Sequence, residues 1–469
     1  VLRAVRSSTE KVPLNLIEVI LAQGSWPQPR NRHSRRLHRP CRTAIDLKQA
    51  MANTHNTSLA PVSQDERLFT GFTHASLWFS LGVGLLVMQV GAYLVPAMGT
   101  RDALMAILIG SIVGSGLLAS TAKLGCDSGL SSAGLMHRVY GSSFARLPVL
   151  LNIVQLVGWT TFELVVMRDG TAAIGERALG LKLNTVWPTL LWGGILILLM
   201  TGSMLTLVRK FVSRIGLPLV IGSLLWLSWH FLGVINAQGM AAFMARPGNG
   251  GMSLLSAIDL VMAMPVSWLP LVADFARHGR SGRSTLAGTW TGYALANAWC
   301  YALGFLVATV SEPGTDLVMA LLFAQGGLLA LGLILLDELD NAYGDVYSGS
   351  VSANSLKPAW SVRRWGLALA LLCTTLACVL PMHSLEPFLL MLSSVFVPLY
   401  GVILGRGSSI TAIPDSALAP KVNTAAAALW LLGIGVFHAA AAWAPQYGSA
   451  LPTLLLTFTL ARLTRGRAQ

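Results

Sequence analysis

Charged residues are scarce in this chain. Asp, Glu, Lys and Arg make up only 11% of its 469 residues, whereas 54% are hydrophobic. A soluble globular protein carries about 25% charged residues. The composition therefore argues against an ordinary soluble domain and predicts an all-α polytopic membrane protein.

Cysteine is also rare, and the familiar chemical motifs are missing. The five cysteines, four of them in or beside apolar runs, are Cys41, Cys126, Cys300, Cys373 and Cys378. They show no metal-ligand spacing, so we interpret them as packing residues rather than a disulfide framework. The nine histidines are scattered, and the glycine-rich stretches lack phosphate-loop spacing. We therefore expect no enzyme, metal site or bound cofactor, although composition alone leaves a membrane-embedded transferase open.

Acidic residues are outnumbered, 20 against 33 Lys and Arg, and most of the excess lies at one end. Residues 1–50 hold ten Lys or Arg against three Asp or Glu, which leaves only +6 of the net charge of +13 for the rest. This distribution argues against nucleic-acid binding. We expect residues 1–65 to be a disordered basic segment. It is either an arm that binds lipid headgroups or, as we favour for residues 1–50, an over-extension upstream of a native start at Met51.

Long apolar runs fill residues 66–469. A membrane span needs about 20 largely apolar residues, and this region contains twelve candidate runs. Lys and Arg concentrate in alternate loops and in the C-terminal tail, and cytoplasmic loops are enriched in these residues. The sequence thus predicts about twelve helices in the plasma (inner) membrane, with both termini cytoplasmic.

Two of the runs are interrupted. The sixth contains Pro265 and Pro270, each of which removes a backbone donor. The first contains Gly82 and Gly84. Freed backbone groups are tolerated in a membrane only where protein or a water-filled cavity satisfies them. We therefore expect Gly82, Gly84 and Pro265 to lie at a binding site, although a simple kink and close helix packing remain open.

Interruptions at the first and sixth runs predict an internal repeat. Two five-span halves, at about 72–236 and 252–405, would be inverted because five is an odd number. Two further helices would follow at about 422–464. A pair of broken segments at corresponding places is the best sequence indication of a transporter site.

Polar residues in the third run share one helix face. Gln155, Trp159 and Glu163 are four residues apart, so they align on a helix. A carboxyl group at membrane depth is costly and usually faces a cavity, a partner or an ion path. An indole for stacking, with a carboxyl one turn away, suits a flat, amine-bearing heterocycle. The alternative is a protonated Glu163 bonded to a neighbouring helix, with Trp159 as packing.

The eighth run ends in an acidic stretch. Asp337 and Asn341 share a face at helical spacing, and Glu338 and Asp345 lie on the adjacent face. These residues are candidates to bind substrate, to carry a coupling proton or to ligate a cation. A solvated acidic helix end is the alternative interpretation.

Four motifs occur in order along the chain: Gly158-Trp159, Ser267-Trp-Leu-Pro-Leu-Val-Ala-Asp274-Phe-Ala-Arg277, Tyr347-Ser348 and Val397-Pro-Leu-Tyr-Gly-Val402. With these motifs, most of residues 66–463 resembles the nucleobase–cation symporter-1 family. The Ser-Trp-Leu-Pro form is most similar to the branch of hydroxymethylpyrimidine (thiamine-precursor) permeases. The resemblance implies a LeuT-type fold of 5+5 inverted repeats plus two helices. It also implies Na⁺- or H⁺-coupled uptake of a flat nitrogen heterocycle by alternating access.

The resemblance also implies roles for individual residues. Trp159 would stack on the substrate ring, Glu163 would bind its edge, and Asn341 would contact it from the eighth span. One departure concerns the sixth span, where the family often places a site tryptophan near the position of Pro265, whereas this chain has Trp268 further on.

A second departure concerns the coupling ion. The family's Na⁺ site usually takes hydroxyl groups from the eighth span, but Leu333-Ile-Leu-Leu336 offers none. This favours H⁺ over Na⁺, with Asp337 and Glu338 as the cation-coupling candidates.

The sequence leads to the hypothesis of a secondary transporter that imports hydroxymethylpyrimidine. A cytosine, purine or hydantoin permease of the same family, or a passive facilitator or channel, remains open. The expected partners are the heterocyclic substrate and the lipid bilayer, with no nucleic acid and no obligate protein partner.

Overall fold

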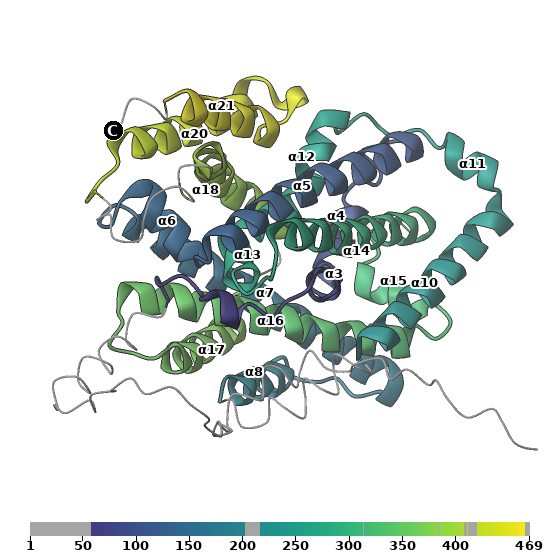
Figure 1. Ribbon diagram of the computed structural model, residues 1–469. Helices are drawn as coiled ribbons and strands as arrows, with labels where there is room; N and C mark the ends of the chain where they lie inside the picture. Colours follow the sequence, from purple (N-terminus) through teal and green to yellow (C-terminus); the bar gives the residue numbers. More distant parts are fainter. Residues whose placement is uncertain are drawn as a thin grey trace, which may run out of the picture.

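A computed structural model describes residues 58–201, 216–312, 314–382, 384–407, 410 and 420–464 of the chain (Figure 1). Met51 and the strongly basic residues 1–50 lie outside this part. The described chain follows a defined path from its start, because Ser131 Oγ donates to the carbonyl of Ser58 at 2.6 Å and the amide of Val62 donates to the carbonyl of Gly129 at 2.9 Å. The disorder expected through residue 65 therefore does not extend over residues 58–65.

Helices make up almost all of the regular structure. Before residue 250 they are η3 (Gln64–Glu66), α3 (Gly71–Ser80), α4 (Leu85–Ala92), α5 (Thr100–Ser128), α6 (Ser132–Tyr140), α7 (Arg146–Leu179), α8 (Val186–Met200), α10 (Leu217–Gln238) and α11 (Met240–Ala245). After it they are α12 (Leu254–Ser267), α13 (Leu269–Ala276), α14 (Gly282–Val310), α15 (Leu317–Phe323), α16 (Gly327–Leu356), α17 (Val362–Val379), α18 (Leu385–Gly405), α20 (Thr424–Trp443), η5 (Pro445–Tyr447) and α21 (Ala450–Leu463).

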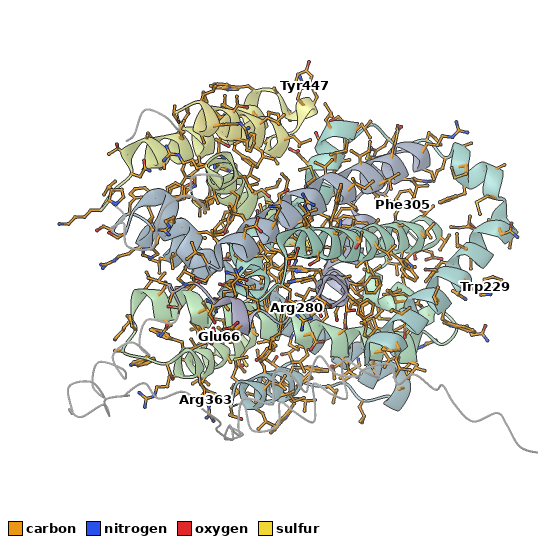
Figure 2. The ribbon with its side chains drawn as sticks, viewed as in Figure 1. Glu66, Trp229, Arg280, Phe305, Arg363 and Tyr447 are labelled. Carbon is orange, nitrogen blue, oxygen red and sulfur yellow. The ribbon has the colours of Figure 1, made fainter. Side chains whose placement is uncertain are left out.

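The helices account for twelve spans. Among the described residues, seven single helices are long and apolar enough to cross a membrane, and the bent pairs α3–α4 and α12–α13 raise this to nine. The shorter apolar helices α8 and α21, and the 30-residue α16 packed along α7, complete the set. Their outer surfaces are apolar, as at Trp229 of α10, which is 78% exposed (Figure 2). The predicted all-α membrane fold is confirmed.

The two halves of the chain have matching helix orders. The second helix of each half, α5 or α14, has 29 residues, and the two pack along each other. The third helices, α7 and α16, do the same, and the short helices α6 and α15 occupy equivalent places before them. In Figure 1, α20 and α21 lie beside α18, on the opposite side of the molecule from α8 and α17.

Both expected interruptions exist, but one lies elsewhere than predicted. The first span bends by 63° between α3 and α4, around Gly82 and Gly84. The sixth bends by 41° at Trp268, between α12 and α13. The break predicted at Pro265 is wrong, because α12 continues through this residue. Pro270 lies in the first turn of α13, where a missing N–H costs little, so it marks the start of the second half-helix.

Loops that follow alternate spans meet on the same side of the molecule. Backbone hydrogen bonds join Val62–Gly129, Phe69–His278, Ser142–Pro420 and Ser143–Lys421 on the face with the basic loops, and Thr100–Arg246 and Asn249–Pro96 on the other. A chain that crosses a membrane at each span must show this alternation.

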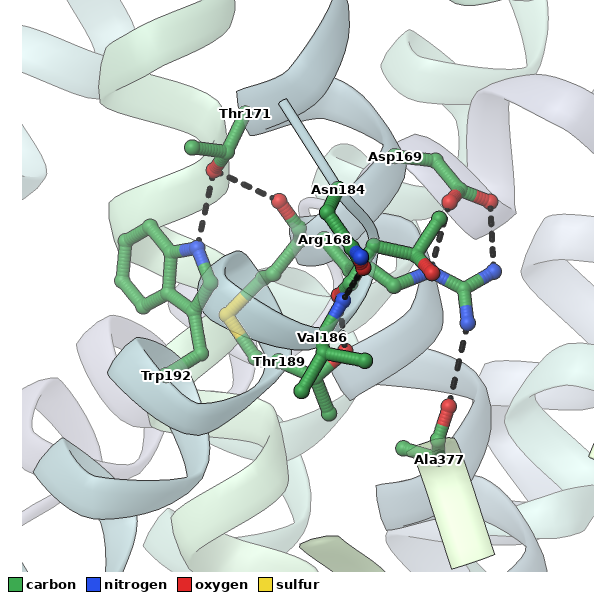
Figure 3. A network of polar contacts seen from close by, with 10 residues as sticks. Arg168, Asp169, Thr171, Asn184, Val186, Thr189, Trp192 and Ala377 are labelled. Carbon is green, nitrogen blue, oxygen red and sulfur yellow. Dashed lines mark hydrogen bonds and ion pairs between the residues drawn. The ribbon is translucent and has the colours of Figure 1, made fainter. Parts of the chain in front are cut away.

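A polar network fixes the end of α7 that lies away from the basic face (Figure 3). Arg168 donates from Nη1 to the carbonyl of Ala377 at 3.0 Å, and its Nε lies 2.7 Å from Oδ1 of Asp169. The indole of Trp192 donates to Thr171 Oγ1 at 2.9 Å. These contacts tie α7 to α8 and α17, so one end of the helix that carries Trp159 is held in place.

Close packing of α14 against α4 gives a first prediction. A Cβ atom at Gly304 would overlap the carbonyl oxygen of Met88, whereas nothing lies within 4 Å of a Cβ at Gly194 on α8. Overpacking costs about 1–3 kcal/mol. Gly304→Val should therefore lower the thermal unfolding midpoint of the detergent-solubilised protein, and Gly194→Val should leave it close to wild type. Equal midpoints for the two variants would contradict this packing.

Candidate substrate site

A narrow pocket lies where the two broken spans meet α7 and α16. The space between its lining residues, part of which is open to solvent, is about 370 Å³. The lining residues are Leu81, Gly84, Leu86, Val87, Trp159, Glu163, Met264, Ser267, Trp268, Leu271, Glu338, Asn341 and Asp345. Both halves of the chain therefore contribute to one enclosed site.

The structure brings five of the nine predicted site and coupling residues to this pocket. Trp159 and Glu163 reach it from α7, Glu338 and Asn341 reach it from α16, and Gly84 lies at the break of the first span. Part of the predicted stripe on the third span and part of the acidic end of the eighth span thus face the same space.

Gly82 and Pro265 lie outside the lining and serve helix packing. A Cβ at Gly82 would come within 2.9 Å of the Ala296 methyl group on α14. A Cβ at Gly114 on α5 would come within 2.5 Å of Pro265 Cγ. The close-packing alternative therefore describes both positions in this structure.

Amides on α7 support the break of the sixth span. Asn152 Nδ2 donates to the carbonyl of Pro270 at 3.0 Å and to Ser352 Oγ at 3.2 Å. Gln155 Nε2 donates to Asn152 Oδ1 at 2.9 Å and to the carbonyl of Ser267 at 3.4 Å. Gln155 therefore lies behind the pocket wall. The sequence interpretation did not include Asn152, although its place three residues before Gln155 puts it on the same helix face.

Residues on α16 support the break of the first span in the same way. Glu338 Oε1 accepts from the Leu85 amide, the first of α4, at 2.5 Å. Asn341 Nδ2 lies 3.4 Å from both the carbonyl of Val83 and Glu338 Oε2. Gly84 permits this approach, because a Cβ there would lie 2.8 Å from Glu338 Oε1.

Asp337 lies behind the pocket wall and binds the end of α3, on the other side of the break in the first span. Its Oδ1 accepts from Ser80 Oγ, at the end of α3, at 3.1 Å. Asp337 and Glu338 therefore bind the two half-helices of the first span, one each. Because both side chains are buried, the alternative of a solvated acidic helix end does not describe them.

Aromatic side chains form one wall. Trp159 is 5% exposed, and its Nε1 has no hydrogen-bond partner among the described residues. Phe388 of α18 contacts the indole edge to face, with ring centroids 5.2 Å apart. Trp268, at the break of the sixth span, also lines the pocket and packs against Trp78 at 5.9 Å. The sequence interpretation had treated Trp268 only as a displaced family tryptophan.

The polar groups of the pocket are mainly acceptors. Glu163, Glu338 and Asp345 line it and are all buried, and the described lining contains no Lys, Arg or His. Glu163 Oε2 and Asn341 Oδ1 lack hydrogen-bond partners among the described residues. In this part of the chain, no group of three or more His, Cys, Asp or Glu is arranged to hold a metal ion. The arrangement suits a small flat ligand that is rich in hydrogen-bond donors.

Comparison with solved structures places the fold. Mhp1, a nucleobase-cation-symport-1 family transporter in a closed conformation with bromovinylhydantoin bound, is similar with a TM-score of 0.72 at 15% identity, covering 87% of this chain and 94% of Mhp1. A Na⁺-coupled sialic acid symporter is similar with a TM-score of 0.58 at 10% identity, covering 90% of this chain and 96% of the symporter. At these identities the likeness establishes the fold, which is the LeuT-type fold of secondary transporters.

Comparison with protein sequences places the family. Residues 61–413 match the family described as permeases for cytosine/purines, uracil, thiamine and allantoin. The cytosine permeases of Escherichia coli O157:H7 and Escherichia coli K12 are each 25% identical over 318 residues, covering 62% of this chain and 68% of each relative. The chain is thus a multi-pass membrane transporter rather than an enzyme, and it belongs to this family of permeases for cytosine/purines, uracil, thiamine and allantoin.

Proposed function

We propose that this transporter imports an aminopyrimidine, most specifically hydroxymethylpyrimidine, by proton-coupled alternating access. The observation that carries the proposal is that Trp159 and Glu163, one helical turn apart, face the same enclosed pocket. An aromatic ring can stack on the indole, while the carboxyl group accepts hydrogen bonds from an amino group at the ring edge.

The other lining residues fit the same substrate. Asn341 Oδ1 and Asp345 would accept from further donors, such as the hydroxyl of a hydroxymethyl group. Leu81, Leu86 and Val87 give an apolar wall against which a ring methyl group would pack. An acceptor-rich pocket favours donor-rich ligands, since a buried acceptor without a partner is costly.

Cytosine is the second candidate, because the curated relatives of this chain are cytosine permeases. Cytosine has the same amino edge, but it carries a ring carbonyl that needs a donor from the protein. Hydantoin, by contrast, has no amino group to offer Glu163. These differences make competition by unlabelled bases a direct test of the substrate.

We place cation coupling on Asp337 and Glu338, with H⁺ as the favoured ion. A proton on Glu338 would weaken its bond to the α4 amide, because a neutral group interacts less with the positive end of a helix dipole. Occupancy of the pocket and the angle of the first span would then be linked. We further place the protein in the plasma membrane with both termini cytoplasmic, as the basic loops on one face suggest.

Uptake of labelled hydroxymethylpyrimidine by transport-deficient cells that express the protein tests the proposal. One co-imported charge at 100 mV supplies about 2.3 kcal/mol, or roughly a fifty-fold concentration ratio. We expect accumulation well above the outside concentration that collapses with a protonophore and persists without Na⁺. Equilibration without accumulation would instead indicate a passive facilitator. Absence of uptake, with the protein present in the membrane, would exclude this substrate and leave cytosine to be tested.

Replacing the stacking residue tests the geometry of the site. Stacking of a base on an aromatic side chain is worth about 1–3 kcal/mol, so Trp159→Leu should raise the KM for uptake about tenfold or more. Trp187→Leu is the matched control, since this indole is 72% exposed on α8. A KM for Trp159→Leu equal to that of the control would remove Trp159 from the site.

Neutralising Glu338 tests the coupling. Glu338→Gln keeps the shape of the side chain but removes its negative charge, so downhill uptake should continue while the accumulation ratio falls to about one. Glu176→Gln makes the same change at an exposed position of α7 and should accumulate substrate like wild type. Protonophore-sensitive accumulation by Glu338→Gln would assign coupling to another residue.

A further inference from the structure

Asp337 accepts from Ser80 Oγ at the end of α3. Five other carboxylates, four of them buried and Asp259 half-buried, fall into two groups. In the first, each side chain binds the amino-terminal end of a helix from another part of the chain. Glu338 binds the Leu85 amide of α4, and Asp274 of α13 accepts from the Ser132 amide of α6 at 3.0 Å. Asp259 of α12 binds the amide of Ala450, which begins α21, at 2.6 Å. Free amides and the helix dipole stabilise these anions.

Glu163 and Asp345 form the second group. Both side chains are buried, at 3% and 2% exposure, and both line the pocket from the neighbouring helices α7 and α16. Neither accepts from the amino-terminal end of a helix among the described residues, and Glu163 Oε2 has no partner there. Asp345 and Glu338 are the acidic residues that lie close enough to Glu163 to repel a negative charge on it.

None of the described residues that line the pocket carries a positive charge. Glu338 is the next carboxyl, Tyr293 of α14 is the nearby phenol, and Cys373 of α17 is the nearby thiol. Two like charges in a buried site of this kind cannot both stay ionised without a counter-charge. At least one of the two carboxyl groups is therefore expected to be protonated in the empty site, and a cationic ligand would allow both to ionise.

We infer that Glu163 and Asp345 form a two-carboxylate receptor for the N-protonated, amidinium form of the heterocycle. This rests on the proposed function and specifies which chemical form of the substrate is bound. A 4-aminopyrimidine protonated at the ring nitrogen beside the amino group presents that N–H and one amino N–H side by side, and its second amino N–H points away from this edge, so the three donors can engage both carboxylates. Charge-assisted hydrogen bonds of this kind are about twice as strong as neutral ones, and the Trp159 face favours a flat cation.

The proton balance of the site is simple. In the empty site one proton is shared by the two carboxyl groups. When a neutral aminopyrimidine enters, that proton moves to the ring nitrogen and leaves two carboxylates facing an amidinium. The ligand therefore needs a basic nitrogen beside an exocyclic amino group. A pyrimidinone, which carries a carbonyl in place of the amino group, would point an acceptor at a carboxylate and be rejected.

Competition between isosteric ligands tests this selectivity. Uptake of labelled hydroxymethylpyrimidine should be inhibited by 4-aminopyrimidine at least a hundred-fold more strongly than by pyrimidin-4-one. Asp345→Asn should reduce this ratio at least tenfold, Asp345→Glu should restore most of it, and exposed Asp102→Asn on α5 should leave it unchanged. Glu163→Gln should abolish uptake while the protein still inserts in the membrane. Equal inhibition by the two ligands in wild type, or an unchanged ratio in Asp345→Asn, would overturn the inference.

The protonation state of the bound ligand can be measured directly on the wild-type protein, which keeps the test independent of variant folding. Solid-state ¹⁵N NMR of ring-labelled 4-aminopyrimidine bound to the protein in lipid, at a pH where the free ligand is neutral, should show a protonated ring nitrogen. A neutral ring nitrogen would contradict the inference yet leave aminopyrimidine transport intact. Failure of any aminopyrimidine to bind would instead refute the proposed function.

Discussion

The structure depends on hydrogen-bond partners for the backbone N–H and C=O groups that two broken helices leave unpaired inside a membrane. An unpaired amide or carbonyl in hydrocarbon costs several kcal/mol, so a break survives only where another helix supplies partners. Here α16 supports the break of the first span through Glu338 and Asn341, and α7 supports that of the sixth through Asn152 and Gln155. In each pair the two side chains are three residues apart and contact each other. The third helix of one half thus supports the first helix of the other, as an inverted repeat requires.

This support also determines where the pocket lies. The side chains that bind the breaks lie on the faces of α7 and α16 that continue into Trp159, Glu163 and Asp345. Any change in the angle between α3 and α4 must alter the contacts of Glu338 and Asn341, which are also pocket residues. Binding and the shape of the first span are therefore linked through shared atoms, without the need for a longer pathway.

Spacing on single helices was enough to predict part of this site. Gln155, Trp159 and Glu163 were aligned because helical neighbours four apart share a face, and the cost of a buried carboxyl marked them as functional. Contacts between helices could not be predicted in this way. The difference between Gly84, which admits Glu338, and Gly82, which packs on α14, depends on the partner helix. Likewise the sequence suggests a break at Pro265, but this residue lies inside α12. Membrane helices tolerate a proline where neighbouring groups satisfy the freed backbone carbonyl.

Asp345 is one of several acidic candidates in the sequence, and only its contacts in the structure distinguish it from the others. Four acidic residues occur between positions 337 and 345, and nothing in their order distinguishes a residue that supports a helix end from one that binds the substrate. The contacts of Glu338, Asp274 and Asp259 do so, because each of these side chains accepts from the first amides of another helix. A carboxylate used in this way is stabilised in the empty protein and has a structural reason to be present. Glu163 and Asp345 have no such partner among the described residues, yet both are buried and line the pocket. Two carboxyl groups that support no helix end are best explained by a ligand that binds both of them.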